Sequence, residues 1–451
     1  MNLVFLFSVV LKGLGAVLEI LLQILVTSHM GVSGYGTYSA WINCADLMFW
    51  LLFSGLVKCN TFYLSGRRTT IQDFKKKYYC RYVLPLLATA VILCLLLSDH
   101  SLIWLVPIIT MLELLVMDRS SALLSRGRSC TSLIGEYVLG RLTLVLGVAV
   151  LGRMGRLGLK SLLFLYILQY CLVICYFLVR QGKTKGYRDI SREVSLKKWR
   201  AYQWSDMMHS MIEQLPVVMQ FCFSGALEAG EDSVVQLVKK LINFISGPTA
   251  KVFLPAFSRL YKADNKREIR KVYSSIMRIQ MLVVGPMAVV LLGFPRVVLG
   301  VLADELVSYD GLFMGCSVIF LLVATLGPCG GILQMTGNEK TDNRIRGCAL
   351  ILMALVMLTT CRDSYFVLYG LCAEVAAEAA VKYLFICRWM NKAPASLRTY
   401  LGWWTIPAIA VGLSHIFKVG NSFVMMILFA GIVFAFSGWQ ELRKNRIFTR
   451  K

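Results

Sequence analysis

The chain has 451 residues, of which 57% are hydrophobic and only 16% charged, and its mean hydropathy is +0.66. Soluble domains carry roughly 25% charged residues, so the composition excludes a soluble globular protein. The net charge of +23 is compatible with nucleic-acid binding. However, the Lys and Arg residues gather in alternate connections between apolar segments, which is typical of membrane topology, and we expect no nucleic-acid partner.

The chain contains no motif for a metal, a cofactor or an enzymatic reaction. Its 14 cysteines form no CxxC pair and no Cys/His cluster at metal-ligand spacing. No P-loop is present, and no connection is long enough for a separate catalytic domain. We therefore expect no disulfide framework, no metal, no cofactor and no enzymatic activity.

Apolar segments long enough to cross a hydrocarbon core of about 30 Å fill the first part of the chain. The N-terminal one lacks a basic region and a cleavage site, so we expect a retained span and not a signal peptide. The connection at residues 66–81 has six basic residues, which predicts a cytoplasmic position. The connection at residues 152–160 would lie outside by alternation, yet it is also basic and is the exception to this rule. The predicted spans are residues 3–27, 37–63, 82–97, 102–124, 133–151 and 161–179.

The longest polar stretch lies at residues 180–200. It has eight basic residues and predicts a cytoplasmic linker. Beyond it, the connections expected outside are acidic, at residues 226–233 and 303–310, and those expected inside are basic, so both termini are predicted to be cytoplasmic. The further predicted spans are residues 204–224, 234–258, 276–301, 311–336, 347–361, 365–388, 401–417 and 422–440.

These segments predict an all-α polytopic membrane protein of about fourteen transmembrane helices, in two pseudo-symmetric six-helix lobes plus a C-terminal helix pair. A weak repeat supports the two lobes, because FKKKYY at residues 74–79 parallels IRKVYS at residues 269–274. Parallel repeats of this kind build transporters with a cavity at their interface. The predicted domains are an N-terminal lobe (1–179, helices 1–6), a basic cytoplasmic linker (180–203), a C-terminal lobe (204–388, helices 7–12) and a helix pair with a cytoplasmic tail (389–451).

One span carries a stripe of polar side chains on a single helical face: Lys240, Asn243 and Lys251. Ionisable groups inside spans are costly in lipid and usually face a water-filled cavity. Two ammonium groups roughly 16 Å apart along a helix suit a polyanion such as a pyrophosphate, and Asn243 suits sugar hydroxyls. Alternatively, each Lys is close enough to a helix end to extend to the membrane interface.

Other intramembrane charges are candidates for proton or Na⁺ coupling, as acidic side chains in transporters often are. Spacing places Lys12 and Glu19 on nearly one face of the first span, and Asp206, His209 and Glu213 on one face of the seventh. Asp118 and Arg119 are expected at an interface, and Glu378 and Lys382, four residues apart, are expected to pair. The candidate coupling residues are Glu19, Asp46, Asp206, His209 and Glu213.

Three stretches resemble one known family. They are GVSGYGTYSAW (31–41), KVFLPAFSRLYKADN (251–265) and GPCGGILQMTGNEKT (327–341). These stretches are similar to those of polysaccharide transporters, the O-antigen and exopolysaccharide flippase branch of the multidrug/oligosaccharidyl-lipid/polysaccharide superfamily.

The resemblance implies a two-lobed flippase of the bacterial inner membrane that alternates between inward- and outward-open forms. Its substrate would be an undecaprenyl-pyrophosphate-linked oligosaccharide, such as an O-antigen repeat unit for lipopolysaccharide, and cation antiport (H⁺ or Na⁺) would drive it. It also implies a groove for the lipid tail along the last two spans, contacts with membrane lipids, and a monomer that associates with polysaccharide assembly proteins. From helical spacing, the residues expected to bind substrate are Lys12, Arg141, Lys240, Asn243 and Lys251.

Three alternatives stay open at this point. A multidrug/cation antiporter of the same superfamily is disfavoured, because a cationic drug would be repelled by Lys240 and Lys251. A lipid II flippase uses similar chemistry, and the sequence separates it poorly from an oligosaccharide flippase. A membrane-embedded glycan polymerase or ligase is less expected, because the outer connections are short and mostly acidic.

Overall fold

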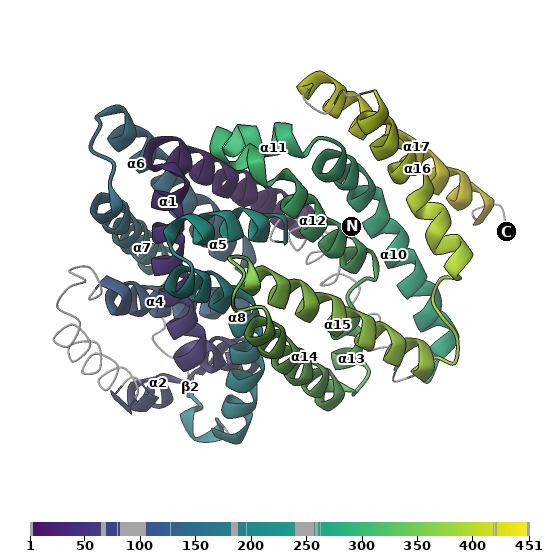
Figure 1. Cartoon of the computed structure of the whole chain (residues 1–451). Helices are drawn as coiled ribbons and strands as arrows, with labels where there is room; N and C mark the ends of the chain where they lie inside the picture. The colour runs from purple at the N-terminus through teal and green to yellow at the C-terminus, as the bar shows by residue number, and fades with distance from the viewer. Residues whose placement is uncertain are drawn as a thin grey trace. The chain divides into compact units, whose positions relative to one another are not determined.

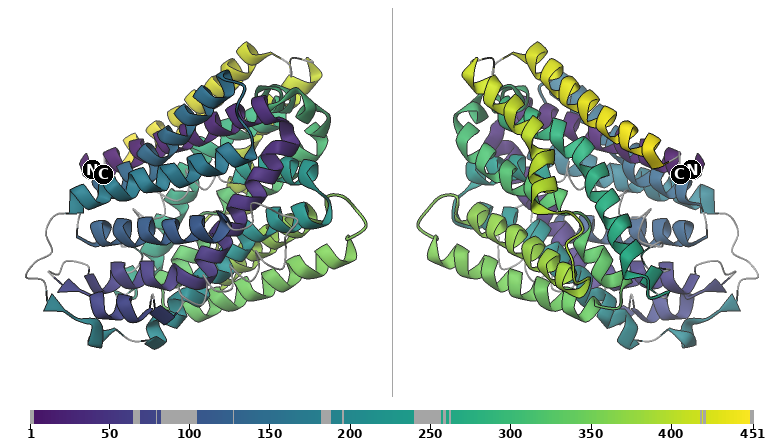
Figure 2. Two further views of the ribbon diagram at one scale, coloured as in Figure 1. Left: turned by 90° about the vertical axis from the view of Figure 1, so that its left-hand side faces the viewer. Right: turned by 90° about the vertical axis from the view of Figure 1, so that its right-hand side faces the viewer.

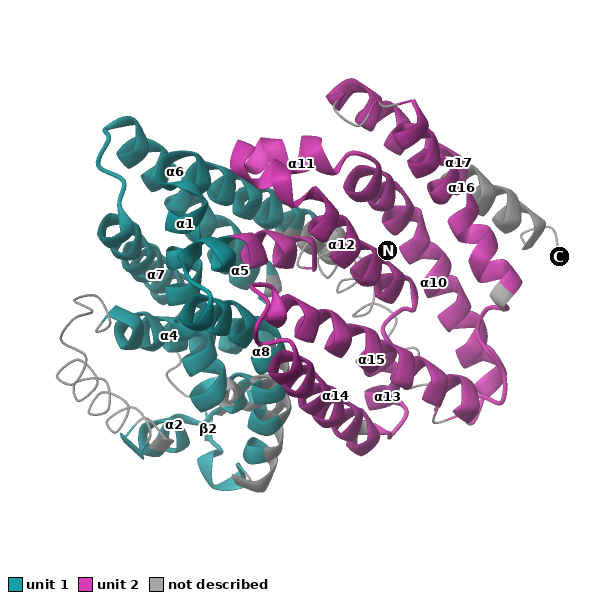
Figure 3. Ribbon diagram, in the orientation of Figure 1, with its two compact units in different colours: residues 1–230 teal, residues 231–451 magenta. Residues whose placement is uncertain are grey.

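Helices make up nearly all of the described chain (Figure 1). Within a bilayer this is required, because backbone polar groups must find hydrogen-bond partners inside their own segment. The computed structural model describes residues 3–64, 69–78, 80–81, 105–126, 128–181, 188–194, 196–239, 257, 260–261, 263–417, 419 and 422–448. Two compact units, residues 1–230 and 231–451, divide the chain (Figure 3). The predicted division into lobes at residues 180–203 is based on the order of the sequence repeats, and it stays a prediction.

Unit 1 contains the helices expected for the first, second, fourth, fifth, sixth and seventh spans. The third predicted span, residues 82–97, lies outside the described residues. The helices are α1 (Leu3–Leu64), α2 (Gln72–Tyr78), α4 (Leu105–Ser125), α5 (Ser129–Leu133), a π-helical turn (Ile134–Leu139), α6 (Gly140–Arg153), α7 (Leu159–Gln181) and α8 (Leu196–Phe223).

The first two predicted spans form two helical arms that meet at a kink within α1, in the stretch 31–36 where the sequence predicts a turn. Only Gly31 leaves the helical conformation, with φ 72° and ψ 175°. Glycine adopts a positive φ without the steric cost that a Cβ would add. The bend therefore changes the direction of the chain at one residue and separates two arms of α1.

Apolar packing against α1 forms the core of unit 1. The second arm buries Phe49 and Phe53 in a cluster with Leu114 of α4 and Trp199 of α8. At Gly55 the helix leaves room for the Trp199 indole, because a Cβ there would lie 2.5 Å from Nε1 of Trp199. A further cluster joins the first arm to α4, α6 and α7.

The basic linker is anchored to the first basic connection by a short parallel sheet. Strand β2 (Arg188–Asp189) pairs with β1 (Thr69–Thr70), the only strands in the described residues. The Asp189 carboxylate accepts hydrogen bonds from the backbone amides of Gln72 (3.0 Å) and Asp73 (3.2 Å) at the start of α2. The sheet thus holds both basic segments at one end of unit 1.

Unit 2 contains the helices expected for the ninth to fourteenth spans, but two of those spans are broken. The helices are α10 (Lys266–Ala288), a π-helical turn (Val289–Gly293), α11 (Pro295–Leu302), a 3₁₀ turn (Asp304–Tyr309), α12 (Asp310–Thr325), α13 (Cys329–Met335), α14 (Glu339–Thr359), α15 (Phe366–Trp389), α16 (Leu397–Ile416) and α17 (Phe423–Phe448). Proline stands at both breaks, as expected for a residue that ends or redirects a helix. Pro295 starts α11, and Gly327–Pro328 separates α12 from α13.

The C-terminal helix pair packs on unit 2. Both α16 and α17 lie against α10 (Figure 2), and Phe294 contacts Phe429 edge-on at 6.0 Å between ring centroids. Many side chains of α17 are exposed and apolar, such as Val424 and Ile432, which is appropriate for contact with lipid.

Five described helical segments are long and apolar enough to cross a membrane by length and composition. They are Gly13–Phe53, Cys130–Arg153, Leu159–Arg180, Lys266–Gly293 and Asp304–Met335. Other long helices, such as α14 and α15, carry several charged side chains within their length, and these reduce their hydropathy. The expected all-α polytopic membrane protein is confirmed.

A close approach of two backbones in unit 1 depends on glycine. A Cβ on Gly36 of α1 would overlap the carbonyl oxygen of Ala226 and lie 2.5 Å from the amide nitrogen of Gly230. A Cβ on Gly230 would in turn overlap the Val32 carbonyl oxygen. Small residues allow such close crossings between membrane helices.

Replacing Gly36 by Val is expected to lower the free energy of unfolding by about 1–3 kcal/mol, because the side chain must push the two backbones apart. Thermal unfolding of the detergent-purified protein measures the loss. Gly13→Ala is the control, since nothing lies within 4 Å of a Cβ there. Equal melting temperatures for both variants would contradict the crossing.

The hydrogen bonds that anchor the linker through Asp189 should depend on pH. Burial acts to raise the pKa of Asp189, but hydrogen bonds from Ser191, Asp73 and Gln72 outweigh it and lower the pKa below its ordinary value. Relative to an unfolded pKa of about 3.9, the stabilisation is therefore present above that pH and lost as the pH falls through the lower, folded-state pKa. Hydrogen exchange of the Gln72 and Asp73 amides should be faster in Asp189→Ala. In the wild type, protection corrected for the intrinsic rate should fall only below about pH 4. Unchanged exchange in Asp189→Ala would refute the anchor.

Candidate transport site

Unit 1 contains an ion pair between two of its spans. Arg141 begins α6 and places its Nε atom 2.9 Å from Oε2 of Glu19 on α1, and about a third of each side chain is exposed (31% and 32%). The π-helical turn Ile134–Leu139 directly precedes α6, and such turns are frequent at functional sites. Gly15 lets this turn approach α1, because a Cβ there would lie 2.9 Å from the Tyr137 Cβ.

A pair of carboxyl groups lies in the same unit. Asp46, on the second arm of α1, and Glu113, on α4, are joined by a side-chain hydrogen bond, and Glu113 is buried. A hydrogen bond between two carboxyl groups needs a proton on one of them, because two carboxylates are both acceptors. The pair is therefore a place where unit 1 can hold a proton.

Tyrosines connect the ion pair to the carboxyl pair. Tyr38 on α1 packs edge-on against Tyr166 on α7, at 6.1 Å between centroids, and Tyr166 against Tyr170 at 5.4 Å. Tyr166 interacts electrostatically with both Arg141 and Asp46. We call Glu19, Asp46, Glu113, Arg141 and these three tyrosines the unit 1 polar cluster.

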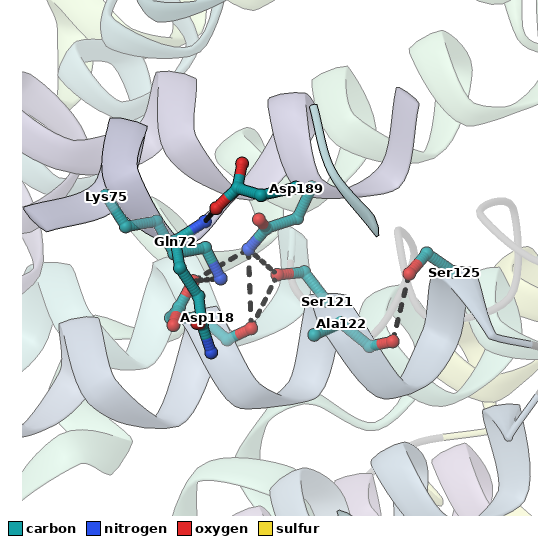
Figure 4. A network of polar contacts seen from close by, with 8 residues as sticks. Gln72, Lys75, Asp118, Ser121, Ala122, Ser125 and Asp189 are labelled. Atoms are coloured by element: carbon teal, nitrogen blue, oxygen red, sulfur yellow. Dashed lines mark hydrogen bonds and ion pairs between the residues drawn. The ribbon is translucent and has the colours of Figure 1, made fainter. Parts of the chain in front are cut away.

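A separate network at the basic end of unit 1 is structural (Figure 4). Asp118 of α4 accepts a hydrogen bond from Nδ2 of Asn60 at 2.7 Å and forms an ion pair with Nζ of Lys75 at 2.7 Å. Asn60 also donates to Oγ of Ser121 at 2.9 Å. Asp118 is therefore a buried anchor for α2, and its expected place at the membrane interface stays a prediction.

Unit 2 contains a buried network of four charges. Nζ of Lys382 (α15) lies 2.5 Å from Oδ1 of Asp342 (α14) and also contacts Glu378 one turn earlier. Nε of Arg346 lies 3.4 Å from Oε1 of Glu378, and Gln334 donates to Oδ2 of Asp342 at 2.9 Å. Two cations thus offset two carboxylates in an almost sealed site, where the Asp342 side chain is 0% exposed.

Glu374 adds a fifth ionisable group beside this network. It lies one turn before Glu378, it is buried, and Lys239 and Arg346 are the cations that interact with it. Gly330 brings the start of α13 close to the same charges, because a Cβ there would lie 3.3 Å from Oδ1 of Asp342. The expected pair of Glu378 and Lys382 is confirmed, within a larger network than its spacing indicated.

The acidic connection expected outside at residues 226–233 is different in the structure. Residues 226–239 are helical, and Glu231 and Asp232 are buried. Asp232 accepts a hydrogen bond from Nε2 of Gln236 at 3.2 Å. The charged composition predicted a connection, but a new helix begins at residue 226 after a turn at Ser224 and Gly225, and it buries the acidic side chains Glu231 and Asp232.

The predicted site residues fall into three groups. Glu19 and Arg141, predicted for different roles, form one ion pair, and Asp46 lies in the same cluster. Glu213 lies half-buried on α8. The other predicted residues are placed on helices without a described side chain, namely Lys12, Asp206 and His209, or lie outside the described residues, namely Lys240, Asn243 and Lys251. Their roles stay predictions.

Sequence reasoning noted Glu113 as an ionisable residue within a span without a partner, and it did not single out Asp342 or Arg346. Asp342 and Arg346 are four residues apart, the helical pairing distance, but they stand in the charged stretch 338–346 that resembled an inner loop. The structure starts α14 at Glu339. The partner of Glu113 lies on another helix, and only tertiary contact shows it.

Solved transporters have this fold. The chain superposes on a structure titled "Lipid II flippase MurJ, inward closed conformation" with a TM-score of 0.69 and 13% identity, over 97% of this chain and 99% of that one. An inward-facing multidrug resistance MATE family transporter of the MOP superfamily gives a TM-score of 0.63 and 11% identity, over 86% and 98% of the chains. The MATE multidrug transporter DinF-BH gives a TM-score of 0.58 and 15% identity, over 86% and 94%.

The chain therefore has the fold of the class of membrane proteins that includes these flippases and MATE transporters. Within that class, residues 142–305 match the family described as polysaccharide biosynthesis protein. No curated protein matches the chain in sequence. The resemblance to polysaccharide transporters that the sequence predicts is confirmed.

The network of unit 2 yields a stability prediction. Lys382→Met should lower the free energy of unfolding by about 3–5 kcal/mol, because it leaves buried carboxylates without their cation. Thermal or denaturant unfolding measures the change. Lys271→Met is the matched control, since its pair with Glu268 is exposed (59% and 41%) and should contribute less than about 1 kcal/mol. Similar effects of the two substitutions would contradict a buried network.

Proposed function

We propose that this protein is a flippase that moves an undecaprenyl-pyrophosphate-linked oligosaccharide, an O-antigen or exopolysaccharide repeat unit, across the bacterial inner membrane by alternating access. The observation that carries the proposal is the polysaccharide biosynthesis match over residues 142–305 in a chain whose fold follows a lipid II flippase over 97% of its length. Both point to a glycan on a lipid carrier.

The charge of the site supports a pyrophosphate ligand. Arg141 is a partly exposed guanidinium within the spans, and arginine binds phosphate oxygens through two parallel hydrogen bonds. We assign the same role to Lys12, Lys240 and Lys251, and sugar contacts to Asn243. The pyrophosphate group is common to every substrate of this kind, so these residues would recognise the carrier and not the glycan.

Cation antiport is the proposed energy source. We assign the proton to the carboxyl pair of Asp46 and Glu113 in unit 1, because its hydrogen bond requires a proton. The remaining candidates are Glu19, Asp206, His209 and Glu213. H⁺ and Na⁺ are both compatible with carboxylate ligands.

The proposed topology places both termini in the cytoplasm. The β1–β2 pairing holds two basic segments at one end of unit 1, and cytoplasmic connections carry the excess of Lys and Arg. We further propose that the protein acts as a monomer among membrane lipids and associates with polysaccharide assembly proteins.

Two other functions use the same fold. Lipid II flipping is favoured by the full-length similarity to MurJ, and it shares the polyprenyl-pyrophosphate carrier. Multidrug export is favoured by the MATE matches, but the cationic Arg141 suits an anionic ligand better than a cationic drug.

Deleting the gene should cause lipid-linked glycan to accumulate on the cytoplasmic face and remove the surface glycan. Complementation with Arg141→Gln should restore about a tenth or less of the surface glycan, since a charge-assisted contact to phosphate contributes about 1.5–3 kcal/mol. Arg296→Gln, which removes an exposed cation, is the control. Normal surface glycan together with a block in cell-wall synthesis would instead favour lipid II, and sensitivity to cationic drugs alone would favour multidrug export.

A further inference from the structure

Glu19 occupies the position that an anionic ligand of Arg141 would need. The Arg141 Nε atom lies 2.9 Å from Oε2 of Glu19, and that oxygen is shielded from solvent. A guanidinium within a membrane span needs a counter-charge, and in the described structure Glu19 is the carboxylate paired with it. A phosphate group therefore has to compete with Glu19 for Arg141.

Groups from three helices surround Glu19 among the described side chains. The cation is Arg141 on α6. The hydroxyl groups belong to Tyr35 and Tyr38 on the second arm of α1 and to Tyr166 on α7, all of which interact electrostatically with Glu19. The Asp46–Glu113 pair interacts with one of these tyrosines, Tyr166. Arg141 is thus the cation that compensates Glu19 among the described residues.

We propose that a lipid-linked diphosphate displaces Glu19 from Arg141, so that protonation of Glu19 and binding of the diphosphate favour each other. This inference rests on the proposed function, since it takes the diphosphate as the ligand. In this proposal Glu19 is not the site that carries the antiported cation. Glu19 is the internal counter-ion of Arg141, the cation that binds the substrate.

Protonation and diphosphate binding favour each other because an uncompensated charge is costly in a poorly solvated site. While Arg141 holds Glu19, both charges are compensated. When the diphosphate takes Arg141, the displaced carboxylate keeps no cation among the side chains that the structure describes, and it takes up a proton from water. Coupling of two binding events is reciprocal, so a proton on Glu19 strengthens diphosphate binding by the same factor.

Protonation of Glu19 together with substrate binding affects how transport can be coupled to a proton gradient. A proton on Glu19 binds together with the substrate, whereas an antiported proton must bind when the substrate leaves. The antiported cation would therefore use another group, and the Asp46–Glu113 pair is the neighbouring one. Glu19 would instead set the affinity of the site on the side of the membrane with lower pH.

The test uses the full-length protein in detergent, with farnesyl pyrophosphate as the probe and intrinsic tryptophan fluorescence as the signal, from pH 5 to pH 8. Glu19→Gln mimics the protonated residue. It should bind the probe on the order of tenfold more tightly than the wild type at pH 8, and the two affinities should converge toward pH 5. Because both proteins meet the same probe, its own titration cancels in the ratio.

Two further variants define the site. Arg141→Gln should lose probe binding at every pH, and Arg141→Lys should retain a pH-dependent affinity. Asp310→Asn, which breaks an exposed ion pair with Arg296 in unit 2, should bind like the wild type. Melting temperatures identify any variant that does not fold.

A second measurement needs no variant. At pH 8 in weak buffer, where the probe is fully ionised, the wild type should take up protons when farnesyl pyrophosphate is added. Absence of proton uptake, or an affinity of Glu19→Gln equal to or below that of the wild type, overturns the inference about Glu19. If Arg141→Gln still loses probe binding in that case, the proposed function stands. No binding of the probe to the wild type or to Glu19→Gln at any pH overturns the proposed substrate class, and the inference with it.

Discussion

Every charge inside the membrane needs a partner, and this constraint organises both units. Taking an ion out of water costs several kcal/mol unless another charge or a proton compensates it. Arg141 is compensated by Glu19, and Asp46 is hydrogen-bonded to Glu113. In unit 2, Lys382 and Arg346 compensate Asp342 and Glu378. In each case the partners come from different helices, so the pairs also fix how the helices pack.

The pairs differ in how accessible they are, and that difference separates structure from function. The Lys382–Asp342 pair is almost fully buried and can be opened only by breaking the packing around it. The Glu19–Arg141 pair is about a third exposed on both sides, so it can open with less loss of packing. A buried network stabilises unit 2, whereas the partly exposed pair is the one for which we propose an exchange of counter-ion.

Local backbone features place these charges. The bend at Gly31 turns α1 so that both of its arms contribute carboxyl groups, Glu19 from the first and Asp46 from the second. The π-helical turn before Arg141 and the small residue Gly15 bring α6 against α1. The β1–β2 pairing and Asp189 anchor the basic linker. Its Lys and Arg residues are therefore held beside the first basic connection of unit 1.

The sequence by itself determined the membrane class, most of the helical segments that the structure describes and the transporter resemblance, because length, apolar runs and charge in connections are properties of local segments. Tertiary structure alone decided which charges meet. Spacing placed Glu19 on one helix, but its partner Arg141 is far away in sequence, and Glu113 and Asp342 gained their roles only by contact with other helices. The acidic stretch at Glu231 and Asp232 shows the same limit, since burial depends on what packs against a helix and composition does not record it.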